Sequence, residues 1–319
     1  MKGEFPGLSR RERNRRSQTS RKNGMAARPA IEEAPNANPP GPTPEIVTPG
    51  NARAVRWKSE ASFFDRCAER ELAGGVAPFS AAVLRRYLGG ELRARRGKDF
   101  RFLLAGDLRG RKVLDVGCGD GANAALLALA GAEVVGVDVS PLSIQLAQRR
   151  AEVNGVSSRV RFVCSAIEEA PLDDGAFDLI WGDGVLHHVI PELDSVLTRL
   201  RRAAKPGARV VFWEPMCLWP WLRRLRKHVP IHTDATPDER PLERAELAVL
   251  RRHFPDLELR FFDGFGRLIR FVLKSMDYES ASWPRRLAAE MLFALDAQLL
   301  SIPALAPLGG SAVLSARAR

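Results

Sequence analysis

The sequence of 319 residues contains only four cysteines, and their positions exclude two kinds of site. Cys67, Cys118, Cys164 and Cys217 lie far apart and form no CxxC pair. A disulfide-stabilised secreted fold and a cysteine-rich metal centre both depend on regular cysteine patterns. We therefore expect reduced thiols in a cytoplasmic protein, and we expect no metal site.

Long apolar runs are also absent, since no stretch of eighteen or more apolar residues occurs. The most apolar region, residues 287–314, is interrupted by acidic residues, prolines and a Gly-Gly pair, so it does not fit a membrane span. No apolar segment follows the basic N-terminus, and we expect no signal peptide. With 45% hydrophobic and 27% charged residues, the composition is that of a globular chain with one large domain or two small ones.

The net charge of +11 is concentrated at the N-terminus. Residues 1–28 hold nine basic and two acidic residues, and residues 29–49 hold seven prolines. Such segments bury too little apolar surface to offset their ordering entropy, so residues 1–55 are predicted to be disordered. A tether to RNA or acidic lipid is the functional alternative for this tail. The folded part has no appended RNA-binding module, so a nucleic-acid partner is not expected.

The pattern of the remaining chain is typical of a doubly wound α/β fold. Helical spacing from Trp57 predicts cap helices over residues 56–106. Short β-branched runs then alternate with helical stretches, which predicts a mostly parallel sheet. Its seven strands are expected at residues 113–116, 134–137, 160–163, 177–181, 210–213, 257–262 and 311–316, with the last one antiparallel. Residues 107–217 form the expected core, residues 218–310 a lid and helical insertion, and residues 311–319 the last strand.

The most informative stretch is residues 113–123 (VLDVGCGDGAN), in which a predicted strand runs into three alternating glycines and a helix follows. Glycines allow the backbone to turn tightly and to approach a ligand closely. Asp138 ends the second predicted strand, twenty-one residues beyond Gly117. An acid at this place can accept hydrogen bonds from the two hydroxyls of a ribose. The pattern therefore predicts a nucleotide-type ligand at the carboxyl edge of the sheet.

The residues alone leave two classes of ligand open. Gly117-x-Gly119-x-x-Ala122 also fits the dinucleotide fingerprint, so an NAD-dependent Rossmann oxidoreductase is the alternative. Asp115 weighs against it, because an acid two residues before the first glycine suits a ligand with a cationic amino group and no pyrophosphate.

Four motifs resemble those of the class I S-adenosylmethionine (SAM)-dependent methyltransferases. The resemblance is strongest to the branch with the ubiquinone/menaquinone C-methyltransferases, methyltransferase type 11. The motifs are residues 113–123, residues 136–140, residues 177–189 (FDLIWGDGVLHHV) and residues 205–207 (KPG) before the fifth strand. The resemblance covers about residues 100–215 and, more loosely, the rest of the folded part. It implies a Rossmann-like fold and methyl transfer from SAM.

The resemblance also implies a SAM pocket at the matching positions. The glycine loop would wrap the methionine part, Asp138 would hold the ribose and Val139 would lie against the adenine. The family often has Gly-Asp-Ala where this chain has residues 165–167 (SAI), so Glu168 or a backbone contact at Ile167 is the expected substitute at the adenine. The implied cofactor-binding residues are Asp115, Gly117, Cys118, Gly119, Gly121, Asp138, Val139, Ala166, Ile167 and Asp183.

Methyl transfer needs a general base only when the acceptor is a weak acid, such as a hydroxyl group or a carbon acid. The candidates are His187, His188, Asp183 and Glu214, which all follow predicted strand ends. A packing role for one histidine and a pocket-shaping role for the other is the competing interpretation. A SAM-binding protein without catalysis is a further alternative.

The expected acceptor is a small apolar or amphipathic molecule, such as a quinone, a lipid precursor or a secondary metabolite. Residues 214–221 are rich in Trp and Pro and are predicted to form a lid over it. Residues 266–310 carry more apolar side chains than two short helices need, and we expect them to roof the strand ends. A homodimer interface and a peripheral membrane contact are the alternatives for this apolar surface.

Overall fold

The structure is a computed structural model that describes residues 49–219, 221–222, 224, 239–265, 268–273, 278 and 280–319. Only the backbone is described for residues 49–52 and 270. All described residues belong to one unit of the chain, residues 47–319. The predicted disorder of residues 1–48 and part of the predicted lid lie outside the described residues.

Helices and strands alternate along the chain as the sequence predicts. The helices are α1 (Pro49–Gly74), α2 (Ala81–Leu88), α3 (Gly97–Ala105), α4 (Ala122–Leu129), α5 (Pro141–Val153), α6 (Leu193–Ala203), α8 (Arg244–His253), α9 (Ile269–Val272) and α10 (Trp283–Leu299). The strands are β1 (Lys112–Val116), β2 (Glu133–Asp138), β3 (Val160–Cys164), β4 (Phe177–Asp183), β5 (Ala204–Pro215), β6 (Glu258–Phe262) and β7 (Ser311–Arg317).

The seven strands form one sheet in the order β3-β2-β1-β4-β5-β7-β6. Strands β1 to β5 pair in parallel, and β7 lies antiparallel between β5 and β6. The strand order reverses direction at β1, and the crevice above such a reversal is where open α/β sheets bind their ligands. The predicted fold class, including the antiparallel last strand, is confirmed.

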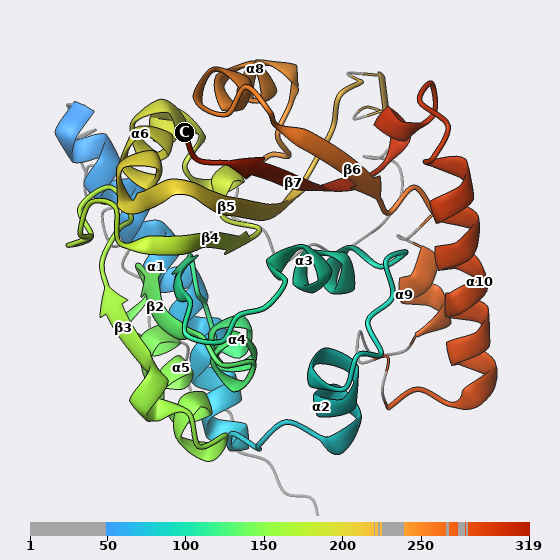
Figure 1. Ribbon diagram of the computed structural model, residues 1–319, viewed down its shortest axis with the longest axis horizontal. Coiled ribbons are helices and arrows are strands. Elements are labelled where there is room, and N and C mark those ends of the chain that lie inside the picture. Colours follow the sequence, from blue (N-terminus) through green and yellow to red (C-terminus); the bar gives the residue numbers. More distant parts are fainter. Residues whose placement is uncertain are drawn as a thin grey trace, which may run out of the picture. The chain divides into compact units, whose positions relative to one another are not determined.

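Each central strand is buried on both faces, so its successive side chains pack into two different cores. Val113 of β1 packs with α3 and α4, whereas the next residue, Leu114, packs with α6 and α8. The same alternation occurs in β4, where Ile180 and Trp181 face opposite sides. Figure 1 shows α6 and α8 on one side of the sheet and α3 and α4 on the other. This two-sided burial explains why the strands appear in the sequence as apolar runs without polar alternation.

Helix α1 begins at Pro49, so the predicted boundary of the folded part at residue 55 is too late. Proline suits the first turn of a helix, where its missing N–H has no partner to lose. Arg53 and Arg56 of the first turns form ion pairs with Glu192. These contacts are made to a residue far along the chain, and the local apolar periodicity does not reveal them.

Helix α1 packs beside α5, and one side chain joins their ends. Oδ1 of Asp65 accepts hydrogen bonds from the Ser140 hydroxyl at 2.6 Å and from the Leu142 N–H at 3.0 Å. Ser140 is also the N-cap residue of α5 and accepts a hydrogen bond from the Ser143 N–H. Asp65 therefore fixes α1 against the chain segment that follows β2. Among the described helices, none is both long and apolar enough to cross a membrane.

Candidate functional site

A cleft lies at the carboxyl ends of β1, β2, β3 and β4, and α1 forms its opposite wall. Its position agrees with the expected ligand site above the reversal of strand order. The cleft is lined by Trp57, Glu60, Phe64, Gly117, Gly119, Val137, Asp138, Val139, Ser165, Ala166, Ile167, Glu168, Asp183, Gly184, Val185, His188 and Val189.

Two glycines shape the floor of the cleft for different reasons. Gly117 has φ +62°, and a Cβ there would lie 2.6 Å from Cγ2 of Val185. Only glycine therefore lets the loop after β4 pack closely on the loop after β1. Gly119 has φ +51° and no atom within 4 Å of the position that its Cβ would take. Its surface is open to a ligand that approaches the backbone.

Asp138 stands at the end of β2 and holds the glycine loop. Its Oδ2 accepts a hydrogen bond from the Gly119 N–H at 2.8 Å, and its Oδ1 accepts one from the Ser140 N–H at 2.9 Å. Burial raises the pKa of this carboxyl group. A carboxylate offers about four acceptor sites, so each oxygen can still accept a hydrogen bond from a ligand hydroxyl.

Asp115 lies beneath the cleft and is absent from its lining. It is 1% exposed, and neither carboxylate oxygen has a hydrogen-bond partner among the described residues. Burial raises its pKa well above the usual range, and the charge of Asp183 adds to the effect. A buried polar group without a partner is rare in native proteins and requires an explanation. A cationic ligand group above the glycine loop would stabilise the charged form of this carboxylate.

Two predicted cofactor-binding residues, Cys118 and Gly121, make packing contacts and are absent from the cleft lining. The Cys118 side chain is 5% exposed and packs beside Gly136, outside the cleft lining. Gly121 has φ +76° at the start of α4, and a Cβ there would lie 2.6 Å from the Cβ of Ala147. Within this motif, Gly119 leaves the backbone open to a ligand, whereas Gly121 allows α4 to pack closely on α5.

Asp183 lines the cleft, but its carboxylate is already engaged. Its Oδ2 accepts hydrogen bonds from Nη2 of Arg101 at 2.8 Å and from Nδ2 of Asn123 at 3.0 Å. Arg101 is fully buried and also donates to the Gly182 carbonyl. Burial alone would raise the pKa of Asp183, but the charge of Arg101 outweighs it and the pKa is lowered. Asp183 is therefore suited to accept a hydrogen bond from a ligand and poorly suited to remove a proton.

Glu214 at the end of β5 organises the loop that carries the two histidines. This fully buried carboxylate accepts hydrogen bonds from the N–H groups of Val185 at 2.9 Å and Leu186 at 2.7 Å. These donors belong to the start of a 3₁₀ turn, η2 (Leu186–His188), whose first N–H groups have no partner within the turn. Glu214 is thus a structural anchor, and the prediction that it is a candidate base does not fit its position.

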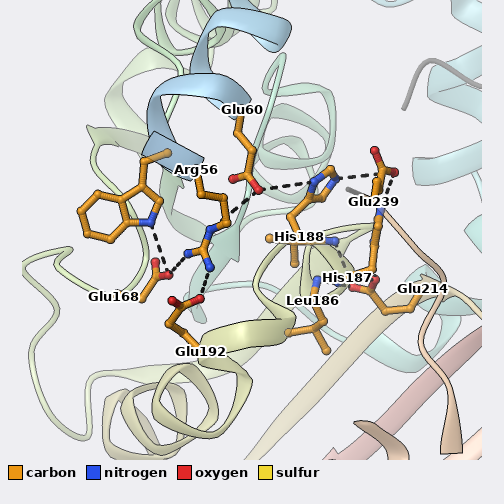
Figure 2. A network of polar contacts seen from close by, with 11 residues as sticks. Arg56, Glu60, Glu168, Leu186, His187, His188, Glu192, Glu214 and Glu239 are labelled. Atoms are coloured by element: carbon orange, nitrogen blue, oxygen red, sulfur yellow. Dashed lines mark hydrogen bonds and ion pairs between the residues drawn. The ribbon is translucent and has the colours of Figure 1, made fainter. Parts of the chain in front are cut away.

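The two neighbouring histidines differ in their surroundings (Figure 2). His187 is held between two carboxylates: its Nδ1 lies 2.8 Å from Oε2 of Glu214, and its Nε2 lies 2.8 Å from Oε1 of Glu239. Burial acts against its charged form, but these hydrogen bonds outweigh burial and raise the pKa of His187 to about 9. His188 lines the cleft, and burial together with the charge of His187 lowers its pKa to about 4. His187 is thus engaged by two carboxylates and His188 lines the cleft, and the role of either as a catalytic base stays a prediction.

Helix α1 supplies a wall of the cleft that the sequence gives no sign of. Trp57, Glu60 and Phe64 lie at positions i, i+3 and i+7 and face the glycine loop. Burial raises the pKa of Glu60 to about 7, although the charge of Arg56 opposes the shift. The helical periodicity of this segment predicts the helix, but it does not indicate that any of these residues line the cleft.

Arg56 fastens this wall to the other side of the cleft (Figure 2). Its guanidinium forms ion pairs with Glu168, at 2.6 Å, and with Glu192. The indole N–H of Trp57 also donates to Glu168 at 3.4 Å. Glu168 lines the cleft as expected for a substitute at the adenine, but its carboxylate is bound to α1.

The described residues of the predicted lid and roof lie outside the cleft lining. The cleft lining contains no described residue from 214–221 or from 266–310. Phe271 of α9 is 71% exposed, whereas Leu273 is buried in a small separate core with Ile269 and Ala289. Residues 266–267, 274–277 and 279 lie outside the described part. The described apolar residues of this segment therefore pack with one another, contact Arg96 and the chain near β6, or face solvent.

The central part of the chain matches known methyltransferases. Residues 114–212 match a family described as a methyltransferase domain. A ubiquinone biosynthesis O-methyltransferase from Chromobacterium violaceum is 39% identical over 106 residues, which is 33% of this chain and 44% of that protein. A probable chloroplastic tocopherol O-methyltransferase from Oryza sativa subsp. japonica is 32% identical over 143 residues, 44% of this chain and 35% of that protein. This chain spans less than half the length of these curated relatives.

A solved structure shares the fold over most of the chain. It is a geranyl diphosphate C-methyltransferase from Streptomyces coelicolor A3(2), with a TM-score of 0.51 and 16% identity over 86% of this chain and 100% of that chain. At this identity the likeness concerns the fold alone. The matches together confirm the resemblance to class I SAM-dependent methyltransferases of the type 11 branch.

Proposed function

We propose that this chain, whose core is a class I SAM-dependent methyltransferase domain, binds SAM in the cleft and transfers its methyl group to a small acceptor. The observation that carries the proposal is the arrangement of Asp138 and Gly119. The carboxylate holds the open glycine by its N–H at 2.8 Å and keeps acceptor sites for ligand hydroxyls. The matches to methyltransferases support this function over the NAD-dependent alternative.

The chemistry of the cleft suits each part of SAM. Asp138 would accept hydrogen bonds from the ribose hydroxyls, and Val139, Ala166 and Ile167 would pack on the adenine. The unpartnered carboxylate of Asp115 beneath the glycine loop favours a ligand with positive charge. A ligand with both an ammonium and a sulfonium group meets that requirement, whereas a pyrophosphate would be repelled.

When bound, SAM supplies a methyl group on a sulfonium sulfur that is already activated for displacement. An acceptor held in line with this methyl group would displace the sulfur with its own electron pair, and the electron pair of the broken carbon–sulfur bond would stay on sulfur. The proton of a hydroxyl acceptor then leaves to water or to a side chain of the cleft. The chain contributes mainly by holding the acceptor in line with the methyl group and by excluding water, which α1 and residues 184–189 are placed to do.

We infer that the acceptor is a small amphipathic molecule with a phenolic or quinol-type hydroxyl group. Two observations support this class. The curated relatives are named as O-methyltransferases of ubiquinone biosynthesis and of tocopherol. The wall of the cleft also presents apolar side chains from Trp57, Phe64, Val185 and Val189.

The test is calorimetry on the full chain with SAM and with NADH, followed by methyl transfer from labelled SAM to catechols, hydroquinones and amines. We expect SAM to bind, NADH not to bind, and label to enter an ether of a phenolic acceptor. Asp138→Asn should weaken SAM by about 2 kcal/mol, because it loses charge-assisted hydrogen bonds. Asp178→Asn is the matched control, since Asp178 also accepts a backbone N–H, from Lys112 at 2.9 Å, and is absent from the cleft lining.

Three results would contradict the proposal in different ways. Absence of SAM binding would refute the cofactor assignment. SAM binding without transfer to any acceptor class would favour a binding protein without catalysis. Label found only on amines would leave the methyltransferase in place and refute the hydroxyl acceptor.

A further inference from the structure

A second cluster of potential ligands lies next to the cleft. One nitrogen of His187, one nitrogen of His188 and one carboxylate oxygen of Glu239 all lie within 4.8 Å of one another. Figure 2 shows the two imidazole rings and the Glu239 carboxylate on the same side of η2. We propose that these three residues bind one divalent transition-metal ion, with Zn²⁺ as the first candidate.

The distances suit a single small ion. Oε1 of Glu239 lies 2.8 Å from Nε2 of His187 and 3.9 Å from Nε2 of His188. Zinc binds nitrogen and carboxylate oxygen at about 2.0–2.2 Å, so donors around a tetrahedral ion lie about 3.3 Å apart. The two measured separations fall on either side of this value. Small rotations of the Glu239 and His188 side chains would equalise them.

The outer contacts of His187 are those that metal-binding histidines usually have. Its Nδ1 lies 2.8 Å from Oε2 of the fully buried Glu214, which is itself fixed by the backbone N–H groups of Val185 and Leu186. A histidine that binds a metal usually donates its other ring N–H to a carboxylate or carbonyl. This contact orients Nε2 of His187 toward Glu239 before any ion arrives.

His188 adds an unsatisfied polar group to the cluster. Its Nδ1 is buried and has no hydrogen-bond partner within the described part of the chain, and Oε1 of Glu60 lies 3.9 Å away. His188 and Glu60 also line the cleft, so the ion would lie in the cleft wall. Three protein ligands leave one tetrahedral position for water or for an oxygen of a small molecule.

The types of ligand atom indicate which metal ions this cluster would bind. Two imidazoles and one carboxylate favour zinc and neighbouring transition metals, whereas magnesium and calcium prefer oxygen ligands alone. The competing interpretation is a protonated His187 that bridges Glu214 and Glu239 without any metal. In that case divalent ions would bind no better to this cluster than to other histidines of the chain.

The sequence predicts no metal site, because it contains no regular metal-ligand spacing. His187 and His188 are adjacent, and Glu239 follows 52 residues after His187. No short motif contains the three, and only the fold of the chain brings them together. This inference rests on their geometry and does not depend on the proposed methyl transfer.

The test uses the full chain, freed of metal with a chelator and then titrated with Zn²⁺, Co²⁺ or Mg²⁺. Calorimetry should give one tight Zn²⁺ site per chain, and Co²⁺ should develop the intense visible absorption of a tetrahedral complex. We expect no comparable Mg²⁺ binding. His188→Gln and Glu239→Gln should each weaken Zn²⁺ at least 100-fold and abolish the Co²⁺ spectrum.

Two controls separate this cluster from the other histidines. His253→Gln alters a mostly buried histidine outside the cluster, whose Nε2 lies 3.0 Å from Oδ1 of Asp194, and it should leave binding unchanged. A His228→Gln, His232→Gln double variant should also retain the site. If Zn²⁺ binding is absent from the wild type, survives in His188→Gln and Glu239→Gln, or disappears only in the double variant, the proposal is overturned.

SAM calorimetry on the same samples keeps the two proposals apart. Glu239 is absent from the cleft lining, so Glu239→Gln should bind SAM within a few-fold of the wild type, which also shows that this variant folds. If SAM binds and Zn²⁺ does not, only the metal site fails. If Zn²⁺ binds and SAM does not, only the proposed function fails.

Discussion

The two ends of the sheet differ in what they bury and in what they expose. At the β3-β2-β1-β4 end, charged and polar groups are buried in mutual contact, as in the pairing of Arg56 with Glu168 and of His187 with Glu214. At the β6 end, apolar groups are exposed: Trp283, Met291 and Phe271 are each more than 60% exposed. Figure 1 shows α10 along the β6 end of the molecule, opposite α1.

This difference indicates where substitutions will be costly. A buried polar group depends on specific partners, and removing one partner leaves the other without compensation. An exposed apolar side chain remains in contact with water in the folded protein, so its removal changes the free energy of unfolding of a single chain only slightly. We therefore expect large effects around the cleft and small ones at the exposed apolar side chains of α10, unless a partner covers α10.

The largest expected effect is that of Glu214→Ala. The change leaves the N–H groups of Val185 and Leu186 and a ring nitrogen of His187 without their buried acceptor. The free energy of unfolding, measured by urea denaturation, should fall by about 3–5 kcal/mol. Glu214→Gln keeps one acceptor oxygen and should lose less. A loss below about 1 kcal/mol would show that Glu214 does not hold the loop.

Arg56→Ala should have the next largest effect. It removes the cation between Glu168 and Glu192, whose side chains are mostly buried. Hydrogen bonds to charged groups are worth about 1.5–3 kcal/mol, so we expect a loss of about 2 kcal/mol and faster hydrogen exchange in α1. Arg70→Ala is the control, because Arg70 is exposed and contacts residues of its own helix. Equal exchange in the two variants would refute the role of Arg56.

Alanine substitutions at two glycines distinguish the effect of backbone strain from the effect of a lost ligand contact. Gly119 and Gly110 both have positive φ, +51° and +68°, and open space where a Cβ would lie. Alanine at either site should cost about 1–2 kcal/mol of stability, because a Cβ is unfavourable in the left-handed region. Only Gly119→Ala should also weaken SAM binding, measured by calorimetry. Unchanged SAM affinity in Gly119→Ala would mean that the ligand does not approach this loop.

The smallest effects are expected on the exposed apolar side. Phe271→Ser and Met291→Gln should each change the free energy of unfolding by less than about 0.5 kcal/mol and leave SAM affinity unchanged. Light scattering of the wild type and both variants checks whether a second copy covers this surface. A dimer that dissociates in Met291→Gln would show that α10 belongs to a subunit interface, and the contrast between the two ends would disappear.

Much of the cleft floor follows from local sequence. The alternation of apolar runs predicts all seven strands, because burial on both faces requires continuous apolar residues. The positions of the glycine loop and Asp138 are also predictable, because the carboxyl ends of the parallel strands β1 and β2 lie at the same edge of the sheet. The side-chain roles within the motif are less predictable. Cys118 and Gly121 serve packing, and that depends on the neighbouring Gly136 and Ala147.

The sequence by itself determined the order of the strands along the chain, the glycine loop and the acid that holds it. These features depend on residues that are adjacent or separated by one βαβ unit. Only the tertiary structure decided that α1 forms the cleft wall, that η2 is fixed from β5, and that His187 and His188 meet Glu239. The physical reason is that these contacts join segments 27 to 136 residues apart, and a buried charge is satisfied by whichever partner the fold brings near it.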